Sequence, residues 1–192
     1  MLHHLLGVVL LLLVFHQGSV QAYSIHKSSR RAFVSSCLSL TLPSVLAPPP
    51  AALAEETKQT GLSPGAIADI VREDVVKRQF LASADLTRSI YSESATFQDE
   101  IDTYTLPKWI KGTKRLFNAD ASNVRLVGDV SATDEEVRFR FDEDLQFAIP
   151  FKPTVSLTGE LVLKRDPATG LITSYKENWD QSVAEVLKTA KF

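Results

Sequence analysis

The segment EVRFRFDEDLQF, residues 136–147, alternates apolar and charged side chains over its first half. Val137, Phe139 and Phe141 have one parity, and Arg138 and Arg140 have the other. Successive side chains of a β-strand point to opposite faces, so this alternation predicts a strand with one buried face. We expect the acidic run Asp142-Glu143-Asp144 to be a solvated strand end or turn and not a metal site.

Other segments with a period of two surround this strand and predict an antiparallel sheet. They cover residues 95–98, 124–130, 155–163 and 171–179. The segment DPATG, residues 166–170, has the composition of a hairpin turn between the last two strands.

Helical patterns precede the sheet. Apolar residues recur at helical spacing from Ile67 to Phe80, with Ser63 and Pro64 as a typical helix start, which predicts a first helix of about five turns. Shorter helices are expected over 86–91, from 106 to about 118, and over 182–188. Helices followed by a sheet indicate an α+β fold, in which a cone-shaped curved antiparallel sheet wraps over three N-terminal helices.

The composition changes near residue 55. Residues 1–54 contain three of the 21 basic residues and none of the 23 acidic ones, so they carry +3 and the remainder carries −5. All four histidines, the single cysteine and the single methionine also precede residue 55. Residues 55–192 therefore lack the side chains for a disulfide, a thiolate zinc site or a Ser-His-Asp triad.

No cofactor or metal is expected, because the chain has no glycine-rich phosphate loop and no acidic spacing typical of a calcium site. The net charge of −2 also excludes the basic footprint typical of a nucleic-acid-binding protein.

Residues 1–54 have the features of targeting signals in series. The apolar run 5–15 is shorter than the roughly 20 residues of a membrane span, so residues 1–22 are predicted to be a signal peptide. Residues 23–54 are predicted to be a plastid transit peptide plus a twin-arginine thylakoid-transfer segment, because Arg30-Arg31 is followed by an apolar stretch and by Ala52-Leu53-Ala54.

This order predicts delivery to the thylakoid lumen of a plastid, with secretion as the alternative. Residues 55–61 would then form a flexible tail, and residues 62–192 a domain that does not span a membrane.

Four further segments carry a resemblance to a known family: FLASADLT (80–87), FQD (97–99), IPFKP (149–153) and ENWD (177–180). In their order and spacing they resemble the nuclear transport factor 2-like (SnoaL-like) superfamily, and more closely its plant and algal plastid branch of unknown function. The resemblance implies a cone-shaped fold with a pocket at one end, and a domain that often dimerises through its sheet.

The resemblance also implies the candidate site. Asp99 is the expected general base and Tyr91 the expected hydrogen-bond donor. If the last strand is regular, Tyr175, Glu177 and Trp179 share a face, which would place Glu177 toward the cavity. The expected pocket residues are Phe97, Trp109, Phe117, Phe139, Tyr175, Glu177 and Trp179.

Three functions remain open at this point, and the sequence favours binding over catalysis. The protein is a carrier or sensor of a small apolar ligand, an auxiliary or assembly protein of a photosynthetic complex, or an isomerase or cyclase that uses Asp99. An aromatic residue in a helix or strand is more often core than pocket wall, and Asp99 equally fits a capping role at the third helix.

Overall fold

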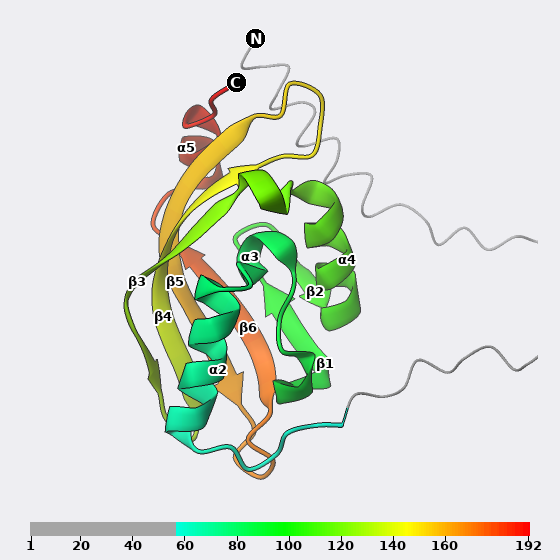
Figure 1. Ribbon diagram of the computed structural model, residues 1–192, viewed down its shortest axis with the longest axis vertical. Helices are drawn as coiled ribbons and strands as arrows, with labels where there is room; N and C mark the ends of the chain where they lie inside the picture. The colour runs from blue at the N-terminus through cyan, green and yellow to red at the C-terminus, as the bar shows by residue number, and fades with distance from the viewer. Residues whose placement is uncertain (1–56) are drawn as a thin grey trace, which may run out of the picture. The chain divides into compact units, whose positions relative to one another are not determined.

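The computed structural model describes residues 57–192, which form a six-stranded sheet and the helices that cover it (Figure 1). The helices are α2 (Pro64–Val76), α3 (Phe80–Ser83), α4 (Leu106–Leu116) and α5 (Val183–Lys188), with short 3-10 turns η1 (Arg88–Ile90) and η2 (Ala119–Ala121). The strands are β1 (Tyr91–Gln98), β2 (Thr103–Thr105), β3 (Asn123–Ala132), β4 (Glu136–Gln146), β5 (Thr154–Arg165) and β6 (Ile172–Trp179).

The strand order in the sheet is β2-β1-β6-β5-β4-β3. Strands β3 to β6 form an antiparallel meander, as the period-two segments predict. Strand β1 pairs with β6 in parallel, so the sheet is not wholly antiparallel. The local pattern of a strand does not encode its direction relative to a partner far along the chain, and only the path of the chain through α4 and the meander sets it.

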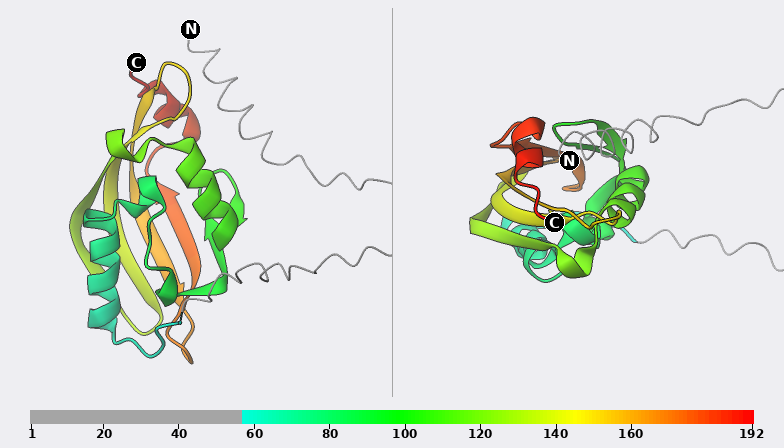
Figure 2. Two further views of the ribbon diagram at one scale, coloured as in Figure 1. Left: turned by 45° about the vertical axis from the view of Figure 1, so that its right-hand side comes forward. Right: turned by 90° about the horizontal axis from the view of Figure 1, so that it is seen from above.

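The sheet is curved, and α2, α3 and α4 lie against one face of it (Figures 1 and 2). The pairing of β3 with β4 is irregular between Val127 and Ser131, where Gly128 has a φ of 73°, and such irregularities increase the local bend of a strand. The α+β class and the curved sheet over three N-terminal helices are confirmed.

The first helix is shorter than predicted. It ends at Val76, and Gln79 adopts a left-handed φ of 56° before α3 begins. The Gln79 side chain compensates for the break, because its Nε2 donates to the Val124 carbonyl at 2.9 Å and its Oε1 accepts from the Val124 amide at 2.6 Å. A contact with β3 therefore interrupts a helix that the apolar spacing alone would continue.

Two further elements differ from the sequence prediction. The helix expected over 86–91 is only the 3-10 turn η1, and Tyr91 already begins β1. The short edge strand β2 has no counterpart in the prediction.

The predicted targeting signals within residues 1–54 lie outside the described residues. Within residues 57–192, no helix has the length and apolar character needed to cross a bilayer. Lys58 and Gln59, at the start of the described part, are tied to the domain. Lys58 Nζ lies 2.6 Å from Glu93 Oε1, and Gln59 donates its amide to the Ser89 carbonyl at 3.0 Å.

Candidate functional site

Three of the six aromatic residues predicted to line a pocket pack against one another. Phe97 stacks on Tyr175 with ring centroids 4.6 Å apart, and Trp109 lies 4.8 Å from Phe97 and 5.4 Å from Tyr175. All three are buried. They form a dense aromatic layer between α4, β1 and β6, which supports the polar residues of the site but is not itself open.

Glu177 lies at the edge of this aromatic layer, on β6. The Tyr175 hydroxyl donates to Glu177 Oε1, and Trp179 Nε1 donates to Glu177 Oε2 at 2.8 Å. The three residues predicted to share a face of the last strand are thus joined by hydrogen bonds. The Glu177 side chain is only partly buried, so solvent still reaches it.

Burial raises the pKa of Glu177 to about 7, although its two hydrogen bonds lower the pKa; the nearby charge of Asp99 adds to the rise. Burial and the neighbouring Glu177 charge also raise the pKa of Tyr175 well above its usual value, so its hydroxyl stays protonated and remains a donor.

Glu143 is the residue that the sequence interpretation missed. It lies inside β4 on the inward row between Phe141 and Leu145, with 3% of its surface exposed, and not at a solvated strand end or turn. The alternation that begins at Val137 continues through residue 143, so the parity of the strand already placed Glu143 among the buried side chains. The acidic residues on either side obscured this signal.

The side chains of Asp142 and Asp144, on either side of Glu143 in the sequence, lie on the opposite face of the sheet. Asp142 and Asp144 both pair with Arg125 of β3, at 2.7 and 2.9 Å. Glu143 is left alone on the inner face, where its Oε2 atom is buried without a hydrogen-bond partner among the described residues.

Glu143 and Glu177 influence each other electrostatically. Burial raises the pKa of Glu143 well above its usual value, and the charge of Glu177 is the largest electrostatic contribution to that rise. A pair of carboxyl groups in this relation holds a proton readily at neutral pH, because two negative charges cannot be accommodated close together.

Asp99 and Tyr91, the predicted base and donor, are not joined by any hydrogen bond within the described part of the chain. The Asp99 carboxylate accepts from the backbone amides of Ile101 and Asp102, each at 2.8 Å, and so stabilises the turn before β2 instead of capping α4. Burial raises the pKa of Asp99, and Asp99 in turn raises that of Glu177, which places it at the periphery of the Glu143–Glu177 pair.

Tyr91 is buried, and a charge that acts on it is that of Asp74. Burial raises the pKa of the Tyr91 hydroxyl well above its usual value, and the charge of Asp74 adds to the effect. Tyr91 and Asp99 thus have different surroundings in the structure. The roles predicted for them remain predictions.

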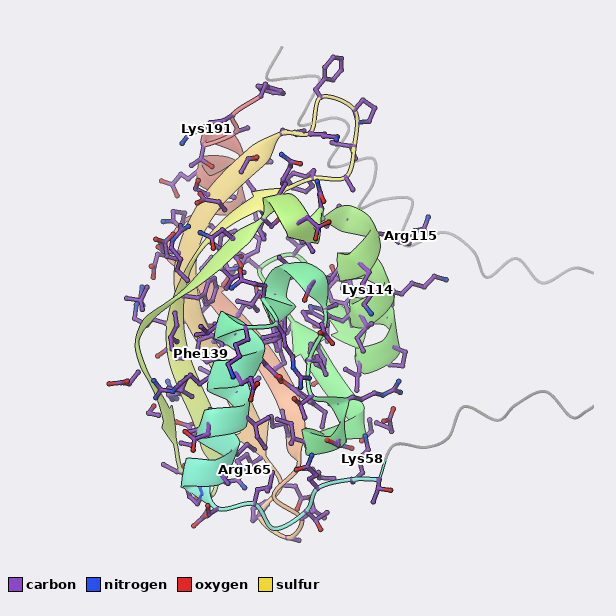
Figure 3. The ribbon with its side chains drawn as sticks, viewed as in Figure 1. Lys58, Lys114, Arg115, Phe139, Arg165 and Lys191 are labelled. Carbon is purple, nitrogen blue, oxygen red and sulfur yellow. The ribbon has the colours of Figure 1, made fainter. Side chains whose placement is uncertain are left out.

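Two other predicted pocket residues lie apart from the aromatic layer. Phe139 is buried beside α2 (Figure 3). Phe117, at the end of α4, packs 5.3 Å from Phe147 and lines an open hollow of about 610 Å³. In the part of the chain that the structure describes, no three or more His, Cys, Asp or Glu side chains are placed to hold a metal ion.

Comparison with known proteins shows the fold. No family model and no curated protein matches the sequence. Among solved structures, a candidate SnoaL-like polyketide cyclase from Jannaschia sp. matches with a TM-score of 0.51 and 9% identity, over 70% of this chain and 96% of that one. This chain has the nuclear transport factor 2-like fold.

Other structures with lower TM-scores match as well. A nuclear transport factor 2-like protein from Burkholderia thailandensis has a TM-score of 0.46 and 11% identity, over 62% of this chain and 92% of that one. An epoxide hydrolase from M. tuberculosis has a TM-score of 0.46 and 13% identity, over 64% of this chain and 86% of that one. At these identities the likeness concerns the backbone, so the chemistry of this nuclear transport factor 2-like domain is argued from its own residues.

Proposed function

We propose that the folded domain binds a small, mainly apolar molecule on the inner face of its sheet, and that Glu143 and Glu177 hold the polar group of that molecule. One observation carries this proposal: the buried Oε2 of Glu143 has no hydrogen-bond partner among residues 57–192. Buried polar atoms in folded proteins are almost always paired, so an unpaired carboxyl oxygen beside a second carboxyl group is a place for a donor from a ligand.

The charges of the site define the polar group it would accept. Glu143, Glu177 and Asp99 are all acidic, and the donors Tyr175 and Trp179 are already engaged by Glu177. An amine or a hydroxyl group on the ligand would relieve the repulsion between the carboxyl groups, whereas a carboxylate would increase it. Trp179, which is only partly buried beside Glu177, offers apolar contact to the rest of the molecule.

A matched ligand series tests this proposal. We expect 1-naphthylmethylamine and 1-naphthylmethanol to raise the melting temperature of the protein, and 1-naphthoate to leave it unchanged, in differential scanning fluorimetry. Glu177→Gln should reduce the shift produced by the amine. Glu135→Gln, an exposed substitution with the same change in charge, should not. Equal stabilisation by the amine and the naphthoate would contradict the proposal.

A second candidate function is proton transfer next to a carbonyl group, as in an isomerase or cyclase. The observation that favours it is the pKa of Glu177, about 7, beside the protonated hydroxyl of Tyr175. A carboxyl group with this pKa is suited to act as a general base at neutral pH, and the hydrogen bond from the Tyr175 hydroxyl holds the Glu177 carboxyl group in position. Glu177 is therefore a candidate base on the inner face, and Asp99, whose Oδ1 accepts from the amides of Ile101 and Asp102, is the alternative.

Turnover of a simple substrate would distinguish these bases. If the domain converts 3-cyclohexen-1-one to its conjugated isomer, we expect Glu177→Gln to lower kcat by about 100-fold or more and Asp99→Asn to retain most activity, followed by ultraviolet absorbance. The reverse result would assign the base to Asp99.

The proposed location is the thylakoid lumen, supported by the order of signals in residues 1–54. An auxiliary or assembly role for a photosynthetic complex is the alternative function there, and it predicts that the protein co-purifies with that complex. Secretion remains the alternative location.

A further inference from the structure

The open hollow of about 610 Å³ lies away from the carboxyl pair, and neither Glu143 nor Glu177 lines it. Its walls come from α3, the end of α4, η2 and the loop 147–152; Figure 1 shows α3 and α4 next to each other on the same side of the sheet. Its volume is in the range of about 300–1,000 Å³ that is common for small-molecule sites.

The walls of the hollow are held in place by the backbone. The Ala148 amide donates to the Leu116 carbonyl at 2.9 Å, and the Asn118 amide donates to the Gln146 carbonyl at 2.8 Å. These bonds and the contact of Phe117 with Phe147 fasten the loop 147–152 to the end of α4. The hollow is therefore a preformed feature of the fold, and a ligand would not have to order it.

The lining combines apolar walls with positive charge. Six of the ten lining residues are apolar: Ala82, Phe117, Ala119, Phe147, Ala148 and Ile149. Lys114 and Lys152 also line it, and no acidic residue does. Within residues 57–192 neither lysine forms an ion pair, whereas Lys58, Lys77 and Lys164 each do.

This arrangement is unusual because residues 55–192 together carry a net charge of −5. Figure 3 shows Lys114 near the end of α4, and Lys152 lies on the loop 147–152, so both lysines bring positive charge to the lining of the hollow. We propose that the hollow is a second ligand site, separate from the carboxyl pair, which binds a small amphipathic anion: the apolar body lies against Phe117, Phe147 and Ile149, and Lys114 and Lys152 pair with the anionic group.

Two fluorescent probes that differ only in charge test this site. 8-Anilinonaphthalene-1-sulfonate carries a sulfonate, and N-phenyl-1-naphthylamine is the same aromatic body without it. In fluorescence titrations, the double variant Lys114→Gln/Lys152→Gln should weaken binding of the sulfonate by about tenfold, the effect of losing two exposed ion pairs, and leave the affinity for the neutral probe unchanged. Added salt should lower only the affinity for the sulfonate probe, because salt screens the attraction between opposite charges.

Two single variants complete the test. Lys111→Gln removes a charge from the same helix outside the hollow and should change neither affinity. Ala148 is exposed at the hollow, so the larger side chain of Ala148→Trp should fill the hollow without disturbing the core. This variant should lower the affinity for both probes. Circular dichroism melts confirm that each variant is folded. The proposal is overturned if the double lysine variant weakens both probes equally, if Lys111→Gln has the same effect as the double variant, or if no variant changes sulfonate binding.

Discussion

Glu177 accepts two hydrogen bonds and is also able to change its charge near neutral pH. Its carboxyl group accepts hydrogen bonds from Tyr175 and Trp179, which stabilise the charged form, yet burial raises its pKa to about 7. Desolvation therefore outweighs two good donors at this position. A carboxyl group in this balance changes its charge near neutral pH, which is useful both for binding a basic ligand and for moving a proton.

This balance predicts how stability depends on pH. The folded protein keeps the Glu177 proton between pH 4.5 and about 7, where the unfolded chain has already released it, so the free energy of unfolding should fall as pH rises through this window. The contribution of Glu177 is at most about 3 kcal/mol.

Denaturant titrations of the wild type and Glu177→Gln at pH 4.5 and pH 8 measure this contribution. The loss of stability between the two pH values should be smaller in the variant. Identical losses in both proteins would show that Glu177 does not titrate in this window.

At the scale of the elements, a buried carboxylate fastens α2 to the segment before β1. Asp74 is 1% exposed and accepts hydrogen bonds from the Thr87 amide at 2.8 Å and the Thr87 hydroxyl at 2.7 Å. Asp74 thereby fixes the path by which the chain leaves α3 and enters the sheet. The apolar spacing of α2 gave no sign of this role, because it depends on a residue thirteen positions away.

Removing this carboxylate should destabilise the fold. Asp74→Ala removes the acceptor of the partly buried Thr87 amide and hydroxyl, and we expect a loss of about 2–4 kcal/mol in the free energy of unfolding, measured by urea denaturation. Asp69→Ala, on the exposed face of the same helix, should change stability by no more than about 0.5 kcal/mol. A similar loss in the free energy of unfolding for both variants would argue against a stabilising role of the hydrogen bonds between Asp74 and Thr87.

At the scale of the whole molecule, the two faces of the sheet differ in character. The inner face carries the core and the carboxyl pair. The other face carries ion pairs. Arg125 with Asp142 and Arg138 with Glu160 join neighbouring strands, and Arg140 of β4 pairs with Asp180, just beyond the end of β6. A homodimer through the sheet, which the family resemblance implies, would have to bury or rearrange these pairs; it remains a prediction.

The proposed location in the thylakoid lumen leads to a further prediction for the whole molecule. If the leader is removed in the thylakoid lumen, sequencing the N-terminus of the protein from its native source should find a start near Glu55. Cleavage there would preserve the contacts of Lys58 and Gln59 with the domain. A start at Tyr23 would instead support secretion.

By itself, the sequence determined the α+β class, the four strands of the meander, the start of α2 at Ser63 and the extent of α4, because these follow from local periodicity and from residues that begin or end elements. The absence of His, Cys and Met from residues 55–192 likewise limits the available chemistry through composition alone. Periodicity, helix starts and composition depend only on which residues occur and on their near neighbours in the sequence, so the sequence alone determines them.

The tertiary structure decided the rest. The parallel pairing of β1 with β6, the break of the first helix at Gln79 and the meeting of Glu143 with Glu177 all depend on residues far apart in the sequence. Glu143 is acidic by sequence, but only the packed sheet buries it and leaves its oxygen without a partner among the described residues. Burial and long-range contact set the pKa values and the partners of these side chains, and neither property belongs to a residue or its neighbours alone.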